Sequence, residues 1–287
     1  MIVVVGGTGN IGRHVVAGLV EREHRVRVLS RDGRRARALL GPAPEIVVGN
    51  LSEPHLATGL LTRADSAFLV TPGSPGQPAL EKSLLDAART TGLRRLVKVS
   101  LIGADPTHFV RYARWQAEIE QHLTGLDLPV TLLRPNWFAE NFLGSAPTIV
   151  GHGTLYGSAG DGKVGFVDSR DTAAVAVATL TEDGHEGREY VVTGPASLSF
   201  TEAAGQLAEG LGRPVTYVDL PDEQLERALL DAALPAEVAA DVVAINRNAR
   251  QGALDTVTST VRDLTGRPAR SLAEWASDNA AAFRSSS

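Results

Sequence analysis

Cysteine is absent from this chain of 287 residues. Disulfides, thiolate nucleophiles and cysteine-ligated zinc or iron–sulfur sites are therefore excluded. Lysine is almost absent, because only Lys82, Lys98 and Lys163 occur and arginine carries the remaining positive charge. Long apolar runs are also missing: Met1–Val5 is too short for a signal peptide or a membrane span. We expect a cytoplasmic protein that does not bind membranes.

An excess of positive charge is missing too, since the formal net charge is −5. No general field attracts nucleic acid, which is therefore not an expected partner. The histidines show no spacing typical of a metal site, and no Gly-x-Ser-x-Gly element marks a hydrolase nucleophile. We expect no bound metal. The length allows one large domain, or a domain with a smaller lobe.

Short β-branched runs alternate with helix-length patterns through residues 1–135. The expected strands are Ile2–Val5, Arg25–Leu29, Glu45–Val48, Ala67–Val70, Arg95–Val99 and Val130–Leu133. The expected helices lie near 11–22, 33–40, 54–61, 78–91 and 108–124. This alternation predicts right-handed βαβ units, and hence an α/β fold with a Rossmann-type, doubly wound parallel sheet.

The pattern changes after Pro135, and residues 136–287 are predicted to form a smaller, mainly helical substrate-binding lobe that is interleaved with the sheet. Further elements are expected at Asp168–Thr181 and Thr201–Leu211 (helices) and at Glu189–Val192 and Val215–Val218 (strands). Residues 222–250 hold two helical patterns broken at Pro235. This pair is either a lid over a site or an ordinary packed hairpin.

The first strand leads directly into a glycine-rich turn, Gly6-Gly7-Thr8-Gly9-Asn10-Ile11-Gly12, which is followed by a helix pattern. In such a turn one glycine permits a sharp bend, another permits close approach to a pyrophosphate, and the last permits close helix–strand packing. The helix N-terminus offers free N–H groups to phosphates. Because strand, turn and helix follow in the required order, the turn predicts a dinucleotide site. The alternative is a merely tight turn.

The second strand is followed by Arg31 and Asp32. A carboxylate here accepts a hydrogen bond from the ribose 2′-hydroxyl of NAD, whereas an arginine accommodates the 2′-phosphate of NADP. Arg31 lies 19 positions after Gly12, close to the expected offset. Positive charge is added nearby by Arg34, Arg35 and Arg37. We therefore predict NADPH as the cofactor, although a shift of one residue towards Asp32 would reverse this prediction.

Three further segments complete a family pattern. They are Arg134-Pro135-Asn136-Trp137-Phe138-Ala139-Glu140-Asn141, Asp168-Ser169-Arg170-Asp171 and Leu264-Thr265-Gly266-Arg267-Pro268. With the glycine turn and Arg31, they make nearly the whole chain resemble the NmrA-like, atypical short-chain dehydrogenase/reductases. That group includes NADPH-dependent quinone and ketone reductases, and also non-catalytic proteins that sense the NADP redox state. The resemblance implies the cofactor and leaves the activity open.

The resemblance also implies where the ligands bind. It places Asn50-Leu51 near adenine and Thr71-Pro72-Gly73 beside the nicotinamide-side ribose. It places Asn136–Phe138 against nicotinamide and substrate. Ser100 follows the fifth strand, and all these positions lie at carboxyl ends of strands, where open α/β sheets bind ligands. Ordinary loop chemistry is the alternative reading of each.

The proton-donor region departs from the superfamily pattern. Typical members carry Tyr-x-x-x-Lys on a helix, where the lysine lowers the tyrosine pKa and binds the ribose. Here the stretch reads Tyr112-Ala113-Arg114-Trp115-Gln116, so Gln116 can hydrogen-bond a ribose hydroxyl but carries no charge. His108, Tyr112 and Gln116 are spaced for one helical face. That face is either an active-site wall, with Tyr112 or His108 as acid and Ser100 orienting the carbonyl, or a solvated or packed stripe.

We predict an NADPH-dependent reductase that transfers hydride to the carbonyl of a bulky aromatic ketone or quinone, including polyketide-type metabolites. The expected aromatic wall comprises Trp115, Trp137 and Phe138. The mechanism is expected to be atypical, because proximity supplies much of the rate and water or the substrate's own phenol can supply the proton. The alternative is a non-catalytic NADP(H) redox sensor with a regulatory partner. An epimerase is disfavoured, and a monomer or homodimer is expected.

Overall fold

Seven strands form the central sheet in the order β3-β2-β1-β4-β5-β6-β9, and every neighbouring pair is parallel. The computed structural model describes residues 1–53 and 55–284. The strands are β1 (Ile2–Val5), β2 (Val26–Ser30), β3 (Glu45–Val48), β4 (Ser66–Leu69), β5 (Arg95–Val99), β6 (Val130–Pro135) and β9 (Glu189–Val192). This is the strand order of dinucleotide-binding Rossmann sheets with one strand added. The predicted fold class is confirmed.

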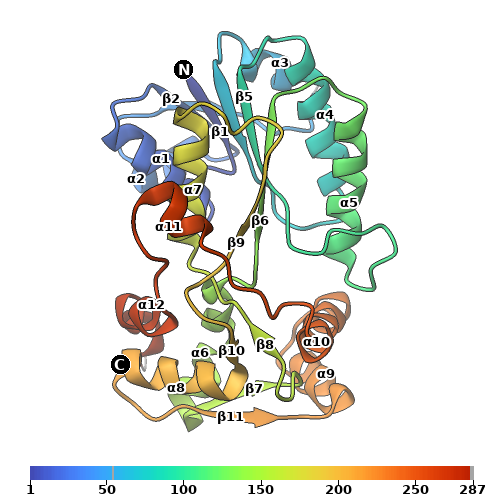
Figure 1. Ribbon diagram of the computed structural model, residues 1–287, viewed down its shortest axis with the longest axis vertical. Coiled ribbons are helices and arrows are strands. Elements are labelled where there is room, and N and C mark those ends of the chain that lie inside the picture. Colours follow the sequence, from blue (N-terminus) through green and yellow to red (C-terminus); the bar gives the residue numbers. More distant parts are fainter. Residues whose placement is uncertain (54, 285–287) are drawn as a thin grey trace.

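Helices cover both faces of the sheet, which explains why a strand such as β1 is buried at every position. Figure 1 shows α1 (Gly12–Glu21), α7 (Ser169–Thr181) and α11 (Thr260–Thr265) on one side, with α2 (Gly33–Leu40) at the sheet edge. The other side is covered by α3 (Leu56–Leu61), α4 (Gln77–Arg89) and α5 (Arg111–Thr124). The helix expected over 54–61 begins in the structure at Leu56, and residue 54 lies outside the described residues.

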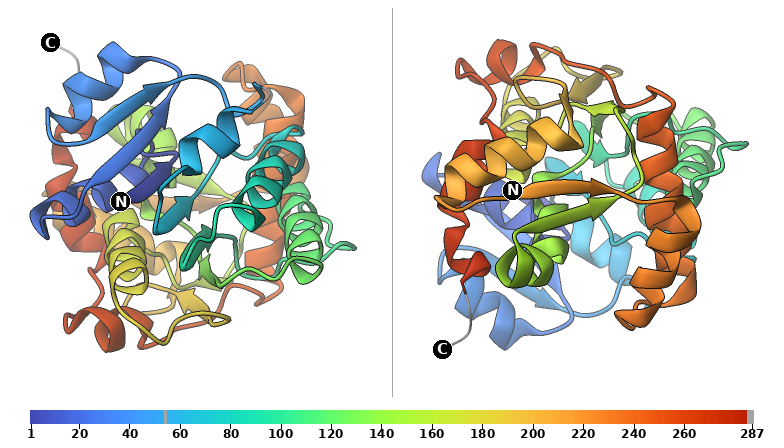
Figure 2. Two further views of the ribbon diagram at one scale, coloured as in Figure 1. Left: turned by 90° about the horizontal axis from the view of Figure 1, so that it is seen from above. Right: turned by 90° about the horizontal axis from the view of Figure 1, so that it is seen from below.

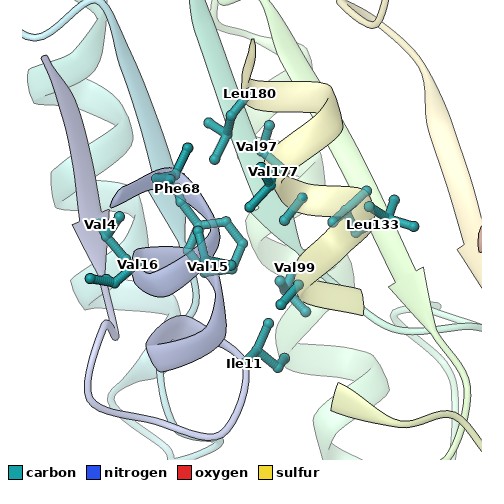
Figure 3. Packing of buried hydrophobic residues seen from close by; sticks show 14 of the residues in the cluster. Val4, Ile11, Val15, Val16, Phe68, Val97, Val99, Leu133, Val177 and Leu180 are labelled. Carbon is teal, nitrogen blue, oxygen red and sulfur yellow. The ribbon is translucent and has the colours of Figure 1, made fainter. Parts of the chain in front are cut away.

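The core under α1 and α7 is built from β-branched residues that sit between helix and sheet. Figure 3 shows Val15 and Val16 of α1 and Val177 of α7 packed around Phe68 of β4. All four side chains are almost completely buried. This packing holds the start of α1 in a constant position relative to the carboxyl ends of the strands, where a ligand site is expected.

The smaller lobe contains more strand than the expected mainly helical lobe. Its helices are α6 (Ala146–His152), α8 (Phe200–Leu211), α9 (Asp222–Asp231), α10 (Ala236–Arg250) and α12 (Leu272–Asp278), with 3-10 turns at Ala139–Ser145 and Ala280–Phe283. Two short ladders join them, one parallel between β7 (Thr154–Gly157) and β11 (Thr216–Asp219), and one antiparallel between β8 (Lys163–Val164) and β10 (Leu198–Ser199). β7, β8 and β10 are too short to show a sequence period.

The chain passes repeatedly between sheet and lobe. After β6 it enters the lobe, returns to the sheet as α7 and β9, enters the lobe again through α8–α10, and returns once more as α11 before ending near α12 (Figures 1 and 2). The sheet therefore extends beyond residue 135 through β9. A cluster of aromatic rings, including Phe142, Phe166, Phe200 and Trp275, forms the core of the lobe.

Ion pairs join α9 to α10, and α10 to α5. Asp222 at the start of α9 binds Arg247 and Arg250 of α10 at 2.9 and 3.1 Å. Arg111 of α5 binds the Asp241 carboxylate of α10 through Nε (2.9 Å) and Nη2 (2.6 Å). Within residues 1–53 and 55–284, no helix is long and apolar enough to cross a membrane.

Candidate active site

The backbone of the glycine turn makes close approaches that only glycine permits. Gly6 has φ +80°, and a Cβ there would lie 2.2 Å from the carbonyl oxygen of Val70. A Cβ on Gly12 would lie 2.1 Å from the carbonyl oxygen of Gly6, so only glycine lets α1 approach β1 this closely. No side chain caps the N-terminus of α1 and no acidic residue occupies its first turn. The turn therefore fits a pyrophosphate.

The two neighbouring candidates after β2 have different surroundings. The Asp32 carboxylate caps α2, accepting a hydrogen bond from the Arg35 backbone N–H at 2.9 Å. Arg31 is exposed, and its guanidinium has no hydrogen bond or ion pair among the described residues. Arg37, by contrast, donates to three backbone carbonyls around Pro42 and serves the loop. Arg31 rather than Asp32 is thus the group free to meet a ribose substituent.

The two side chains of the segment expected near adenine, Asn50-Leu51, have different surroundings. The Asn50 Oδ1 accepts from the Ser52 backbone N–H at 3.2 Å, which closes a tight turn. Leu51 points the other way, since its side chain is 7 % exposed and packs in the core with Leu60 and Leu61. Leu51 therefore supports this loop from below, and its side chain does not face solvent.

A cavity of about 630 Å³ opens at the carboxyl ends of β4, β5 and β6. Ile11 at the end of the glycine turn lines one end, and α10 and Phe200 of the lobe line the other. Besides Ile11, the structure brings nine of the predicted site residues into this one space: Thr71, Gly73, Ser100, His108, Tyr112, Gln116, Asn136, Trp137 and Phe138. They meet because parallel strands end at the same sheet edge.

Two expectations about α5 are wrong. The helix begins at Arg111, so His108 does not share a helical face with Tyr112 and lies in the preceding loop. Trp115 is not among the residues that line the cavity. Its ring instead packs edge-on against Tyr112 with centroids 5.4 Å apart, and the Arg111 guanidinium lies 5.5 Å from the ring centroid. Of the three residues of the predicted aromatic wall, Trp137 and Phe138 line the cavity and Trp115 does not.

Tyr112 is a neutral phenol held against the backbone of the strand-to-helix loop after β4. A Cβ on Gly73 would lie 2.5 Å from its Cε1 atom, so glycine is required for the ring to lie there. Burial, followed by the negative charge of Asp241, raises the pKa of Tyr112. This is opposite to the shift that a neighbouring lysine produces in typical members of the superfamily.

The loop around His108 determines which of its ring nitrogens carries the proton. Its Nδ1 accepts a hydrogen bond from the Val110 backbone N–H at 3.0 Å, so the neutral imidazole is protonated at Nε2. Arg114 donates to the His108 carbonyl oxygen at 2.7 Å and fixes the loop. His108 is therefore a hydrogen-bond donor on the cavity wall.

Two polar residues of the cavity are already engaged within the protein. The Ser100 hydroxyl donates to the Glu120 carboxylate, which is itself paired with Arg134 at 2.8 Å. Ser100 can then only accept, so the expected role of orienting a carbonyl by donation is not available in this arrangement. The Asn136 amide donates to the Leu254 carbonyl at 2.9 Å and accepts from the Trp137 backbone N–H at 2.8 Å. Its side chain joins β6 to the lobe.

Lys98 is the site residue that sequence reasoning missed. It lies in β5, is completely buried, donates to the Gln116 Oε1 atom and forms an ion pair with Glu81, whose Oε2 is 3.0 Å away. Gln116, which replaces the superfamily lysine, is thus itself bound to a lysine from another element. A charged residue between Val97 and Val99 in an otherwise apolar strand was the signal available in the sequence.

A Rossmann sheet, a glycine turn fitted to a pyrophosphate and a cavity at the strand ends define a dinucleotide-binding protein of the short-chain dehydrogenase/reductase type. The NmrA-like family model matches residues 1–275, and the chain belongs to that family. It is 40% identical over 283 residues to an NAD(P)H azoreductase of Xenophilus azovorans, covering 99% of each chain. It is 38% identical over 286 residues to a (4-alkanoyl-5-oxo-2,5-dihydrofuran-3-yl)methyl phosphate reductase of Streptomyces griseus, again covering 99% of each.

Among solved structures, the chain is similar to an NADPH-dependent quinone oxidoreductase of Escherichia coli in complex with NADPH. The TM-score is 0.89 at 29% identity, and the match covers 97% of this chain and 99% of that one. The likeness therefore includes the sheet and the smaller lobe together.

Proposed function

We propose that the protein is an NADPH-dependent reductase of flat, uncharged aromatic acceptors, with quinones as the principal class. The observation that carries this proposal is the continuity of one cavity from Ile11, beside the glycine turn, to Trp137 and Phe200 in the lobe. A bound cofactor and an acceptor would share this space, as direct hydride transfer requires. The azoreductase and quinone oxidoreductase relatives support a reductase.

The cofactor proposal rests on the residues that surround its expected position. Arg31 would meet the 2′-phosphate, and the N-terminus of α1 would meet the pyrophosphate through Gly9, Asn10 and their neighbours. Thr8, with Thr71, Pro72 and Gly73 after β4, would border the remaining phosphate and ribose groups. Asn50 would lie near adenine. When bound, NADPH supplies the hydride.

The acceptor proposal rests on the chemistry of the cavity wall. Among its described residues there is no lysine or arginine, and the Asp241 carboxylate is held by Arg111. Trp137 and Phe138 supply flat apolar surface beside a few polar groups. Such a wall suits an aromatic ring with carbonyl oxygens and offers no cation to a phosphate. Quinones and polycyclic ketones of the polyketide type fit this description.

The proton that completes the reduction comes, in this proposal, from water, and His108 stabilises the oxygen that receives it. As hydride reaches the acceptor, its oxygen becomes an anion, which accepts a hydrogen bond from His108 Nε2 and takes its proton from water. Tyr112, a poor acid because its pKa is raised, acts as a neutral hydrogen-bond donor to the same acceptor. Quinone, NADPH and one proton thus give hydroquinone and NADP⁺.

The test is oxidation of NADPH by purified protein with a panel of acceptors. The panel pairs each neutral quinone with its sulfonated analogue and adds an azo dye and a polycyclic aromatic ketone. We expect turnover of the neutral quinones and a KM at least about tenfold higher for the sulfonated analogues, because the wall offers the added anion no cation. Equal activity with both members of each pair would contradict the proposed acceptor class.

The alternative is a redox sensor that binds NADP(H) without turnover. It predicts different affinities for NADP⁺ and NADPH and no oxidation of NADPH by any acceptor. The same panel therefore separates the two functions, since a sensor would show binding by calorimetry and no turnover.

A further inference from the structure

The Lys98 ammonium group donates two hydrogen bonds to protein acceptors and forms an ion pair with Glu81. Its Nζ lies 3.0 Å from Glu81 Oε2 and 3.1 Å from the Val99 carbonyl oxygen, and it also donates to Gln116 Oε1. Lys98 and Glu81 are both 0% exposed. A buried ion pair of this kind is weak evidence for stability, because desolvation of both charges offsets their attraction. We therefore ask which side chains the Lys98–Glu81 pair orients.

The pair determines the direction of the hydrogen bonds on one wall of the cavity. Because Gln116 Oε1 accepts from Lys98, the Gln116 amide nitrogen is left as a donor at the cavity. Because the Thr71 hydroxyl donates to Glu81 Oε1 at 2.6 Å, its lone pairs remain as acceptors there. Gln77 donates to the same Oε1 at 3.1 Å and closes the network.

We propose that Lys98 and Glu81 are positioning residues that preset Gln116 as donor and Thr71 as acceptor for the nicotinamide-side ribose. Each ribose hydroxyl both donates and accepts, so this fixed donor–acceptor pair is complementary to a diol. The inference deepens the proposed function and rests on its NADPH site. Typical members carry a lysine four residues after their tyrosine, where this chain has Gln116. Here a lysine from β5, Lys98, acts on the same place through the Gln116 side chain.

The arrangement differs chemically from a lysine at position 116. Glu81 neutralises the Lys98 charge, so the pair orients neutral groups without placing a net cation beside Tyr112. Low polarity around the buried pair strengthens each hydrogen bond in the chain from Lys98 through Gln116. Without Lys98, the Gln116 amide could adopt either of two orientations. The hydrogen bond from Lys98 selects one of them before the cofactor binds.

The test is calorimetric affinity for two ligands, NADPH and adenosine 2′,5′-bisphosphate, which ends before the nicotinamide-side ribose. We expect Lys98→Met to weaken NADPH binding about tenfold and to leave the bisphosphate unchanged. Lys98→Met/Glu81→Gln, which leaves no unpaired buried charge, should show the same selectivity if the single variant folds poorly. Lys82→Met, which removes the surface lysine paired with Glu118, is the matched control.

A cycle with Gln116→Leu tests whether Lys98 acts through Gln116. If it does, Gln116→Leu and Lys98→Met/Gln116→Leu weaken NADPH binding by the same factor as Lys98→Met. Additive losses would overturn the proposal, as would equal losses for both ligands or unchanged NADPH affinity in a folded variant. Absence of turnover with every acceptor, with this binding pattern intact, would instead count against the reductase function alone.

Discussion

At the level of single side chains, the cofactor prediction depends on Arg31, because Asp32 is committed to capping α2. Arg31→Ala removes a charge-assisted contact with the 2′-phosphate and should weaken NADPH binding by roughly tenfold to a hundredfold. NADH lacks that phosphate, so its affinity should stay constant and serves as the internal control. Calorimetry with both nucleotides makes the measurement. Equal losses for NADPH and NADH would mean that Arg31 supports the fold of the site instead.

The group that stabilises the developing oxyanion is the subject of a second prediction at this level. His108→Leu removes the hydrogen-bond donor to the developing oxyanion, so kcat with a quinone should fall about a hundredfold, whereas His108→Gln keeps a donor and should lose much less. Tyr112→Phe should lower kcat only a few-fold, because the raised pKa makes this phenol a poor acid. Steady-state kinetics from mildly acidic to mildly alkaline pH compare the two. The reverse order of effects would make Tyr112 the main hydrogen-bond donor to the oxyanion, and two unaffected variants would contradict a role for either side chain.

At the level of elements, α10 is held against α5 by Arg111, which binds both Asp241 and, at 2.9 Å, the Glu237 carboxylate. Since α10 lines the cavity, Arg111→Met should loosen this wall and raise the KM for a bulky quinone by about threefold to tenfold. NADPH affinity should change much less, because the glycine turn is remote from α10. Arg262→Met, at an exposed pair on α11, is the control. An unchanged KM would show that α10 is an ordinary packed helix.

The strands and helices of the sheet were predictable because their residues alternate between two clear patterns. β1, β3, β5 and β9 have the predicted bounds, since β-branched runs end at polar or glycine residues there. The start of α5 was not predictable to the residue. His108 accepts from the Val110 N–H, and this local bond holds the loop extended until Arg111. The later start of α5 took His108 off the helical face expected for it.

The sequence also predicted which residues meet at the site, but it did not predict the hydrogen bonds that these residues form. Thr71, Ser100 and Asn136 follow neighbouring parallel strands, so the topology alone brings them together. The partners that determine what each can donate lie elsewhere in the chain: Glu120 for Ser100, and Glu81 for Thr71. Lys98 was missed for the same reason, because Glu81 is 17 positions away in sequence and only the packing of α4 on β5 joins them.

For the whole molecule, stability in acid should depend on the link between α9 and α10. Arg250 and Arg247 hold the pKa of Asp222 down at about 2, well below its ordinary value of 3.8. The ionised carboxylate therefore contributes stability above about pH 4, and that contribution is lost as the pH falls towards about 2. Because solvent screens the two exposed arginines, the contribution is at most about 1 kcal/mol.

Asp222→Asn should accordingly lower the melting temperature at neutral pH by a few degrees, and the difference from the unaltered protein should vanish near pH 2. Calorimetric melts over this range make the comparison. Asp263→Asn, which removes an exposed carboxylate of α11, should change little at any pH. A difference between Asp222→Asn and the unaltered protein that persists undiminished in strong acid would show that the charge of Asp222 is not responsible.

The position of Trp137 gives the molecule a built-in optical reporter. Of the three tryptophans, Trp137 is the one that lines the cavity, while Trp275 is buried in the lobe core and Trp115 lies behind Tyr112. Indole emission overlaps the absorption of a reduced nicotinamide and not that of an oxidised one. Excitation of Trp137 should therefore be transferred to bound NADPH and be restored when hydride leaves. In a Trp115→Phe background, a single turnover would be visible as a fall and recovery of tryptophan fluorescence.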